Sequence, residues 1–234
     1  MSEHVKRVVT AAALLAFGIG VYFWLRQLGV QILVAAASIA AYWEFLDILL
    51  DKSTGSRRFK FWSALAAAAL MILLLVTQRE WTLTPVYFAF LLFMGQALVA
   101  SHRHGQPEVH LKDALVQVFG LFYITGFLSF VPEIHAMPNG PVWFILLLGI
   151  VWGSDIAAYY GGKAMGRNKL SPNLSPGKTM EGSATALVVN ALAAWPVHHF
   201  FLPETAAWKL AVIMVLTSAA AMAGDLLESL VKRV

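Results

Sequence analysis

Long apolar runs, separated by short polar segments, dominate the sequence. They cover about 8–25, 28–50, 61–77, 84–101, 113–131, 141–162, 183–201 and 207–230. A run of about 20 apolar residues is long enough to cross the hydrocarbon core of a bilayer as a helix. The runs show no alternation of apolar and polar positions, which argues against a transmembrane barrel. The pattern therefore predicts about eight transmembrane helices, the first of them retained because no signal-peptide cleavage site follows it.

Composition supports the same class of protein. Of the 234 residues, 59% are hydrophobic and only 13% are charged, against about 25% charged in an ordinary soluble domain. The absence of Cys and of a glycine triplet period excludes disulfide-stapled and collagen-like chains. We therefore predict an all-α, polytopic integral membrane protein. Residues 1–234 form one membrane domain, with N-terminal helices over 1–140 and the chemically distinctive helices over 141–234.

Basic residues sort to one side of the predicted membrane. Of the 17 Lys and Arg residues, all but Arg26, Arg79 and Lys209 fall at the termini or in alternate connections. The positive-inside rule then places both termini and the loop 163–182 in the cytoplasm, and residues 132–140 on the opposite side. The net charge of +4 reflects this orientation and does not indicate nucleic-acid binding.

Charged residues inside apolar spans are costly and indicate function by default. Asp155 lies in the sixth run with Tyr159 one turn further along, and helix–helix contact is the alternative role for this acid. Asp225 and Glu228 share a face of the last run. Glu228 is placed to pair with Lys232 four residues on, so Asp225 is the better candidate for a ligand.

Three further carboxylates share a helix face at the cytoplasmic end of the second run. They are Glu44, Asp47 and Asp51. They either reach the interface and pair with nearby basic residues, or line a polar cavity. The sequence leaves both roles open.

The segment 166–182 is the most unusual connection. Two Ser-Pro steps stiffen it, Gly177 follows the second, and Lys178 and Thr179 come directly before a predicted helix with Glu181 in its first turn. Backbone N–H groups at a helix start, a lysine and hydroxyls together favour phosphate binding. It is not a P-loop, because the first glycine and a preceding strand are missing. Lys163, on the preceding span end, is interpreted as a general positive-inside charge.

Two motifs resemble a known family. Ser154-Asp155, Lys169-Leu170-Ser171-Pro172 and the stretch SPGKTMEG at 175–182 resemble phosphatidate cytidylyltransferases, also called CDP-diglyceride synthases. The stretch GDLLESLVKR at 224–233 is similar to the opening of the C-terminal signature of that family. The resemblance covers about 150–233 and rests on span count and hydropathy before that.

The resemblance implies a magnesium-dependent nucleotidyl transfer in phospholipid biosynthesis. CTP and phosphatidic acid would give CDP-diacylglycerol and pyrophosphate in the cytoplasmic (inner) membrane, with the active site facing the cytoplasm. The implied partners are CTP, phosphatidic acid and membrane lipids, with no nucleic acid, and a homodimer is left open. The implied roles are Asp225 and Asp155 as Mg²⁺ ligands and, with Lys178, as catalytic residues, and Ser175, Lys178, Thr179, Glu181, Lys232 and Arg233 as substrate-binding residues.

Two alternatives to an active enzyme are left open, and the first follows from the end of the sequence. The family signature continues past Lys232-Arg233 with a further metal-site acid, whereas this sequence ends at Val234. A catalytically impaired, truncated homologue that still binds nucleotide or lipid is therefore one alternative. A small membrane transporter with Asp155, Asp225 and Glu44 along its path is the other, although no inverted repeat is found.

Overall fold

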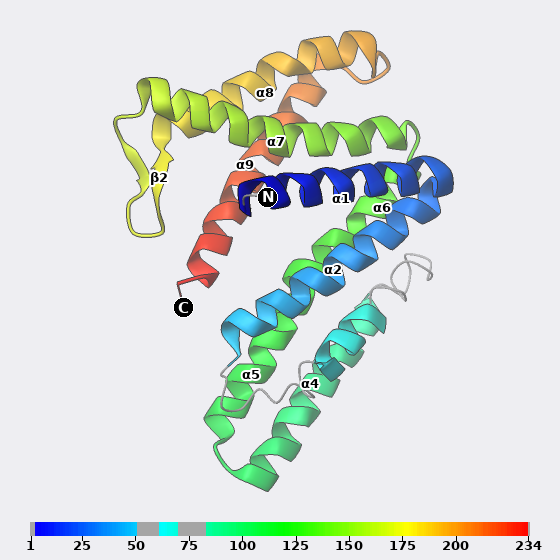
Figure 1. Ribbon diagram of the computed structural model, residues 1–234, viewed down its shortest axis with the longest axis vertical. Helices are drawn as coiled ribbons and strands as arrows, with labels where there is room; N and C mark the ends of the chain where they lie inside the picture. Colours follow the sequence, from blue (N-terminus) through cyan, green and yellow to red (C-terminus); the bar gives the residue numbers. More distant parts are fainter. Residues whose placement is uncertain (1–2, 51–60, 70–82, 234) are drawn as a thin grey trace. The chain divides into compact units, whose positions relative to one another are not determined.

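The computed structural model describes residues 3–50, 61–69 and 83–233. The chain divides into two compact units, Met1–Pro138 and Asn139–Val234, and helices dominate both (Figure 1). Each predicted apolar run coincides with helical residues, although the third run is described only over 61–69. Asp51 and the basic residues at 52, 57, 58, 60 and 79 lie outside the described residues.

Helices alone form the described part of the first unit. They are α1 (Glu3–Leu25), α2 (Gln27–Leu49), the helical residues 61–69, α4 (Leu83–His104), α5 (Pro107–Gly120), the π-helical turn η2 (Leu121–Gly126) and α6 (Phe127–Ala136). The last three are continuous in the chain, so the predicted run 113–131 is extended at both ends into one long helix.

Helix α2 is joined by polar contacts to the long helix α5–η2–α6. The Tyr42 hydroxyl donates to the Gln117 carbonyl at 3.2 Å, and Ser38 Oγ donates to Thr125 Oγ1 at 3.1 Å. All four residues are buried. Glu44 and Asp47 are both exposed on α2, so burial does not force either carboxylate to find a ligand.

The second unit contains three helices and a β-hairpin. These are α7 (Gly140–Met165), β1 (Lys169–Ser171), β2 (Ser175–Thr179), α8 (Met180–Phe200) and α9 (Ala207–Val231). Helices α7 and α8 run side by side, and the hairpin joins the end of one to the start of the other (Figure 1). The expectation that no strand precedes the Gly-Lys-Thr string was wrong, because β1 and β2 pair antiparallel, with Lys169 opposite Thr179. A strand therefore does precede the Gly-Lys-Thr string.

Glycines allow α7 and α8 to approach closely near the hairpin. A Cβ on Gly161 would lie 2.4 Å from Thr185 Oγ1, and a Cβ on Gly182 would lie 2.5 Å from the Ala158 carbonyl oxygen. Such distances are shorter than van der Waals contact, so a larger residue at either position would push the helices apart. Small residues at helix interfaces are typical of membrane proteins.

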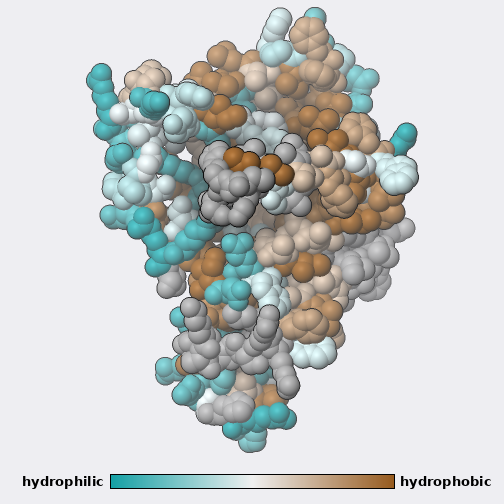
Figure 2. All heavy atoms as spheres, in the orientation of Figure 1, coloured by the Kyte–Doolittle hydropathy of each residue, from teal (hydrophilic) through white to brown (hydrophobic). Residues whose placement is uncertain are grey.

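Large apolar side chains remain exposed along the helices of the second unit. Trp152 is 57% exposed, Leu192 70% and Trp195 66%. Hydrophilic residues gather instead around the hairpin (Figure 2). Within the described residues, four helices are long and apolar enough to cross a membrane: Gln27–Leu49, Pro107–Ala136, Gly140–Met165 and Ala207–Val231. These features agree with an α-helical membrane protein, whereas the count of eight spans and the cytoplasmic termini stay predictions.

A buried polar cluster joins the three helices of the second unit. Ser154 of α7 and Ser218 of α9 are hydrogen-bonded at 2.7 Å, and Asn190 Nδ2 of α8 donates to Ser154 Oγ at 3.0 Å. All three residues are at most 4% exposed. In an apolar surrounding an unsatisfied polar group is costly, so these contacts favour one register of the three helices.

Replacing Asn190 by Ala should therefore lower the free energy of unfolding by about 1 kcal/mol, the size typical of an interhelical hydrogen bond in a membrane. Reversible unfolding in mixed micelles would measure the change. Leu192→Ala is the matched control, because that side chain is 70% exposed on the same helix. An equal loss in the two variants would contradict the interhelical role.

Candidate active site

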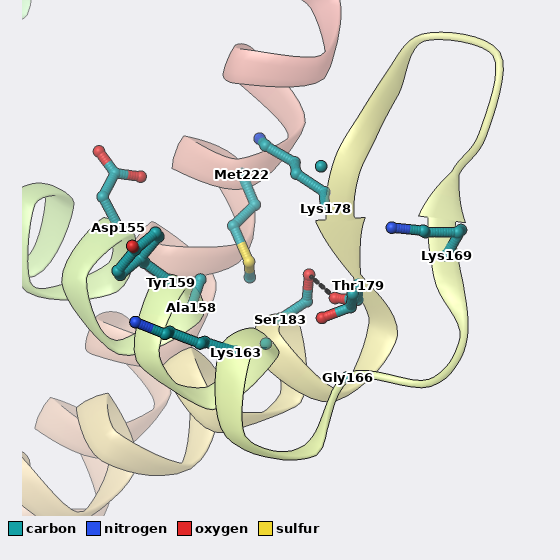
Figure 3. A pocket seen from close by; sticks show the side chains of 12 residues that line it. Asp155, Ala158, Tyr159, Lys163, Gly166, Lys169, Lys178, Thr179, Ser183 and Met222 are labelled. Atoms are coloured by element: carbon teal, nitrogen blue, oxygen red, sulfur yellow. Dashed lines mark hydrogen bonds between the residues drawn. The ribbon is translucent and has the colours of Figure 1, made fainter.

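A cavity of about 520 Å³ opens in the second unit between α7, the hairpin, α8 and α9. Its walls carry three lysines, one aspartate, hydroxyls and several small residues (Figure 3). The lining residues are Asp155, Ala158, Tyr159, Gly162, Lys163, Gly166, Lys169, Gly177, Lys178, Thr179, Ser183 and Met222.

Helix α7 forms one wall of the cavity. Asp155, Tyr159 and Lys163 follow one another at intervals of four residues and therefore lie along one helix face. Ser154 directs its own side chain into the buried cluster with Asn190 and Ser218. Because neighbouring residues on a helix point about 100° apart, that anchor turns Asp155 away from the cluster and toward the cavity.

The hairpin forms the facing wall and supplies Lys169 and Lys178. The Lys178 ammonium makes an ion pair with the Asp225 carboxylate of α9. The Lys178 side chain is 25% exposed and that of Asp225 is 48% exposed. The structure thus brings together three residues that the sequence singled out separately, namely Asp155, Lys178 and Asp225.

Thr179 connects the cavity to the start of α8. Its Oγ1 accepts a hydrogen bond from Gly182 N at 3.1 Å and so caps the helix, and Ser183 Oγ donates to the Thr179 carbonyl at 3.2 Å. Its hydroxyl still has a proton to donate, because the cap uses only a lone pair. Thr179 therefore holds the helix start in place and can still donate to an anion in the cavity.

Glu181 does not line the cavity. Its carboxylate accepts hydrogen bonds from Arg167 N at 3.1 Å, from Asn168 N at 3.1 Å and from Asn168 Nδ2 at 2.8 Å. The pKa of Glu181 is lowered chiefly by its own backbone N–H and also by these donors, with partial desolvation opposing them. Where the sequence predicted a substrate contact, the structure gives Glu181 contacts that tie the end of α7 to the first turn of α8.

The remaining predicted substrate residues lie outside the cavity lining. Ser175 pairs with Ser171 across the hairpin. Lys232 Nζ lies 2.5 Å from Glu228 Oε1, which confirms the ion pair predicted between these two residues four apart on the helix. Arg233 Nε donates to the Leu174 carbonyl at 3.0 Å, so the end of α9 contacts the hairpin turn.

Two lysines of the cavity were missed as site residues. Lys163 was interpreted as a general positive-inside charge, whereas the structure places it in the lining of the cavity. Lys169 lines it as well, since the hairpin pairs it with Thr179. The signal for Lys163 was its spacing of eight from Asp155, which puts both residues on one helix face.

The described residues contain no group of three or more His, Asp or Glu side chains that could hold a metal ion on their own. Mg²⁺ is commonly bound by one or two carboxylates together with substrate phosphates and water. The donor set here, Asp155 in the cavity and Asp225 beside Lys178, fits an ion that arrives with a phosphorylated substrate.

The fold and the cavity define a helical membrane protein with a basic, hydroxyl-lined site suited to phosphate groups. Comparison with known proteins identifies the family: residues 5–234 match the cytidylyltransferase family, and the chain belongs to it.

Three relatives are phosphatidate cytidylyltransferases. That of Brucella suis biovar 1 is 29% identical over 245 positions, covering 100% of this chain and 81% of the relative. That of Synechocystis sp. is 29% identical over 265 positions, covering 97% and 84%. That of Mycobacterium bovis is 33% identical over 147 positions, covering 61% and 47%. The similarity to the first two extends through both structural units.

Replacing Glu181 by Gln should destabilise the second unit at neutral pH. A neutral side chain loses the charge assistance of the hydrogen bonds that the Glu181 carboxylate accepts from Arg167 and Asn168. A carboxyl group with a lowered pKa stabilises the fold above its ordinary pKa, near 4.5, and this stabilisation is lost as the pH falls through the lowered value. The difference in Tm between wild type and Glu181→Gln should therefore shrink on acidification.

Thermal unfolding in detergent across this pH range measures that difference. Glu204→Gln is the matched control, because Glu204 is exposed in the connection between α8 and α9. A difference in Tm for Glu181→Gln that is independent of pH would contradict the role given to its charge.

Proposed function

We propose that this protein is a phosphatidate cytidylyltransferase that converts CTP and phosphatidic acid into CDP-diacylglycerol and pyrophosphate. The observation that carries the proposal is the basic cavity of the second unit, built from the motifs that the sequence shares with that family. The names of the relatives that match almost the whole chain support the same reaction.

In this reaction an oxygen of the phosphatidate phosphate attacks the α-phosphorus of CTP. The bond from that phosphorus to the oxygen bridging to the β-phosphate breaks, and pyrophosphate leaves with the electron pair. No covalent enzyme intermediate is needed, because the lipid phosphate is itself the nucleophile. The main obstacle is the repulsion between two polyanions, which fixed cations in a partly dry site reduce.

The cavity offers the groups that this step requires. Lys163, Lys169 and Lys178 supply positive charge near the phosphates, and the Thr179 hydroxyl can donate a hydrogen bond. Tyr159 presents a ring that is 63% exposed beside them. These side chains would hold and orient the two substrates in line.

Magnesium is part of the proposal. Asp225 and Asp155 are the residues that would hold Mg²⁺, together with phosphate oxygens of the substrate. A divalent cation there would neutralise charge on the phosphates and on the leaving pyrophosphate. Asp225 is engaged with Lys178 in this structure, so Asp225 must exchange that partner to serve the metal.

We place the protein in the cytoplasmic membrane with the hairpin facing the cytoplasm, where CTP is available. The exposed apolar faces of α7 and α9 would meet lipid, so phosphatidic acid can approach within the bilayer. No observation on the described residues favours a transporter path, since Asp155 borders a cavity at the hairpin and Asp225 is paired with a lysine.

The test is incubation of the purified chain with labelled CTP, phosphatidic acid and Mg²⁺ in mixed micelles. We expect labelled CDP-diacylglycerol from the wild type and none from Asp225→Asn, a near-isosteric change that removes a charge that hard cations prefer. Wild-type turnover by Asp225→Asn would contradict its role. Binding of CTP without turnover by the wild type would favour the catalytically impaired homologue.

The orientation can be tested with single cysteines, because the chain contains none of its own. A cysteine replacing Asn173 in the hairpin turn should resist an impermeant thiol reagent applied from outside intact cells, and one replacing Asn139 should react. The expectation rests on four basic residues in 163–182 against none in 132–140. The opposite labelling pattern would reverse the topology.

A further inference from the structure

The three lysines of the cavity are not electrostatically equivalent. The charge of Lys178 is balanced by Asp225 in a direct ion pair. Lys163 and Lys169 are exposed, and neither is paired with a carboxylate of the described residues. An anion that enters the cavity therefore meets two uncompensated ammonium groups and one that is already neutralised.

We propose that Lys163 and Lys169 form the primary phosphate-binding pair of this cavity, and that Lys178 joins them only after a metal ion has drawn Asp225 away. This inference rests on the proposed function for the identity of the substrate, but the binding step can be measured without it. The ligand chemistry is the phosphate oxyanion, which a nucleoside triphosphate and a phosphatidate headgroup share.

The placement of Asp155 indicates where the anion lies. Asp155 precedes Lys163 by eight residues, which corresponds to about 12 Å along α7. A phosphate is repelled by the carboxylate and attracted by the lysine, so it should bind at the hairpin end of the cavity. That end also carries Lys169 and the hydroxyl of Thr179.

The ion pair makes Lys178 a poor first contact. For Lys178 to bind a phosphate in the absence of metal, the pair with Asp225 must separate and leave a carboxylate near the incoming anion. Once Asp225 coordinates a divalent cation, that penalty disappears and Lys178 is released toward the phosphates. The contribution of Lys178 to affinity should therefore depend on metal, whereas those of Lys163 and Lys169 should not.

The experiment is a pyrophosphate titration of the full chain in detergent by calorimetry, with a chelator to remove divalent cations. Lys163→Gln and Lys169→Gln should each weaken binding about tenfold, the loss expected for one charge-assisted contact. Lys178→Gln, made together with Asp225→Asn so that no unpaired carboxylate remains, should change it less than about twofold. Lys209→Gln is the matched control for a lost positive charge. Lys209 is not among the residues that line the cavity, and it lies beside Trp208 at the start of α9.

Two further arms test the exchange of partners. With Mg²⁺ present, Lys178→Gln should also weaken pyrophosphate binding about tenfold. Without metal, Asp225→Asn should tighten binding in comparison with wild type, because it releases Lys178. The sign of that change distinguishes the ion pair from a simple metal ligand, whose removal has no effect when no metal is present.

Titrations with CTP and with phosphatidic acid in phosphatidylcholine vesicles identify which phosphate the two lysines bind. If both Lys163→Gln and Lys169→Gln bind one of these ligands more weakly than wild type, the result supports the pair. The ligand that is affected is then the one whose phosphate the two lysines bind. Absence of saturable pyrophosphate binding by the wild type, or a metal-free loss in Lys178→Gln/Asp225→Asn as large as in the two lysine variants, would overturn the inference. Failure of the proposed function is a separate result, namely binding through Lys163 and Lys169 without product.

Discussion

The hydrogen bonds among Ser154, Asn190 and Ser218 determine how the rest of the second unit is arranged. They join α7, α8 and α9 at one buried point, and each helix then carries a cavity residue one or two turns away on the same face. Ala158 follows Ser154 by four residues, and Met222 follows Ser218 by four. The register of three apolar helices, which packing alone would specify weakly, is set by a few polar atoms.

Further contacts fix the ends of α7 and α8 next to the hairpin. Glycines bring α7 and α8 together, and the Glu181 carboxylate ties their ends to one another. Thr179 is both the last residue of β2 and the cap of α8. The hairpin is therefore held at both of its ends, and its lysines face the cavity from a defined position.

The sequence predicted the positions of the helices well, because long apolar runs carry a strong signal. It missed the hairpin, because strands of three and five residues that contain Pro176 and Gly177 show the composition of a loop. Motifs singled out Asp155, Lys178 and Asp225, and the structure places the first two in the lining of one cavity and the third in an ion pair with Lys178. Lys163 was overlooked because the positive-inside rule already explains a cytoplasmic lysine, although its spacing of eight from Asp155 was visible. The contacts of Glu181 could not be predicted, since hydrogen bonds across 13 and 14 residues leave no periodic pattern.

Helix α9 contacts the hairpin at two levels, through Asp225 with Lys178 and through Arg233 with the Leu174 carbonyl. Asp225 lies in the last two turns of α9 and Arg233 lies just beyond the end of the helix, so the hairpin should follow the direction of α9. Helices that span a bilayer adjust their tilt to its thickness. Lipid composition would then act on the cavity mechanically: a thinner or thicker bilayer would tilt α9 and move the lysines relative to α7.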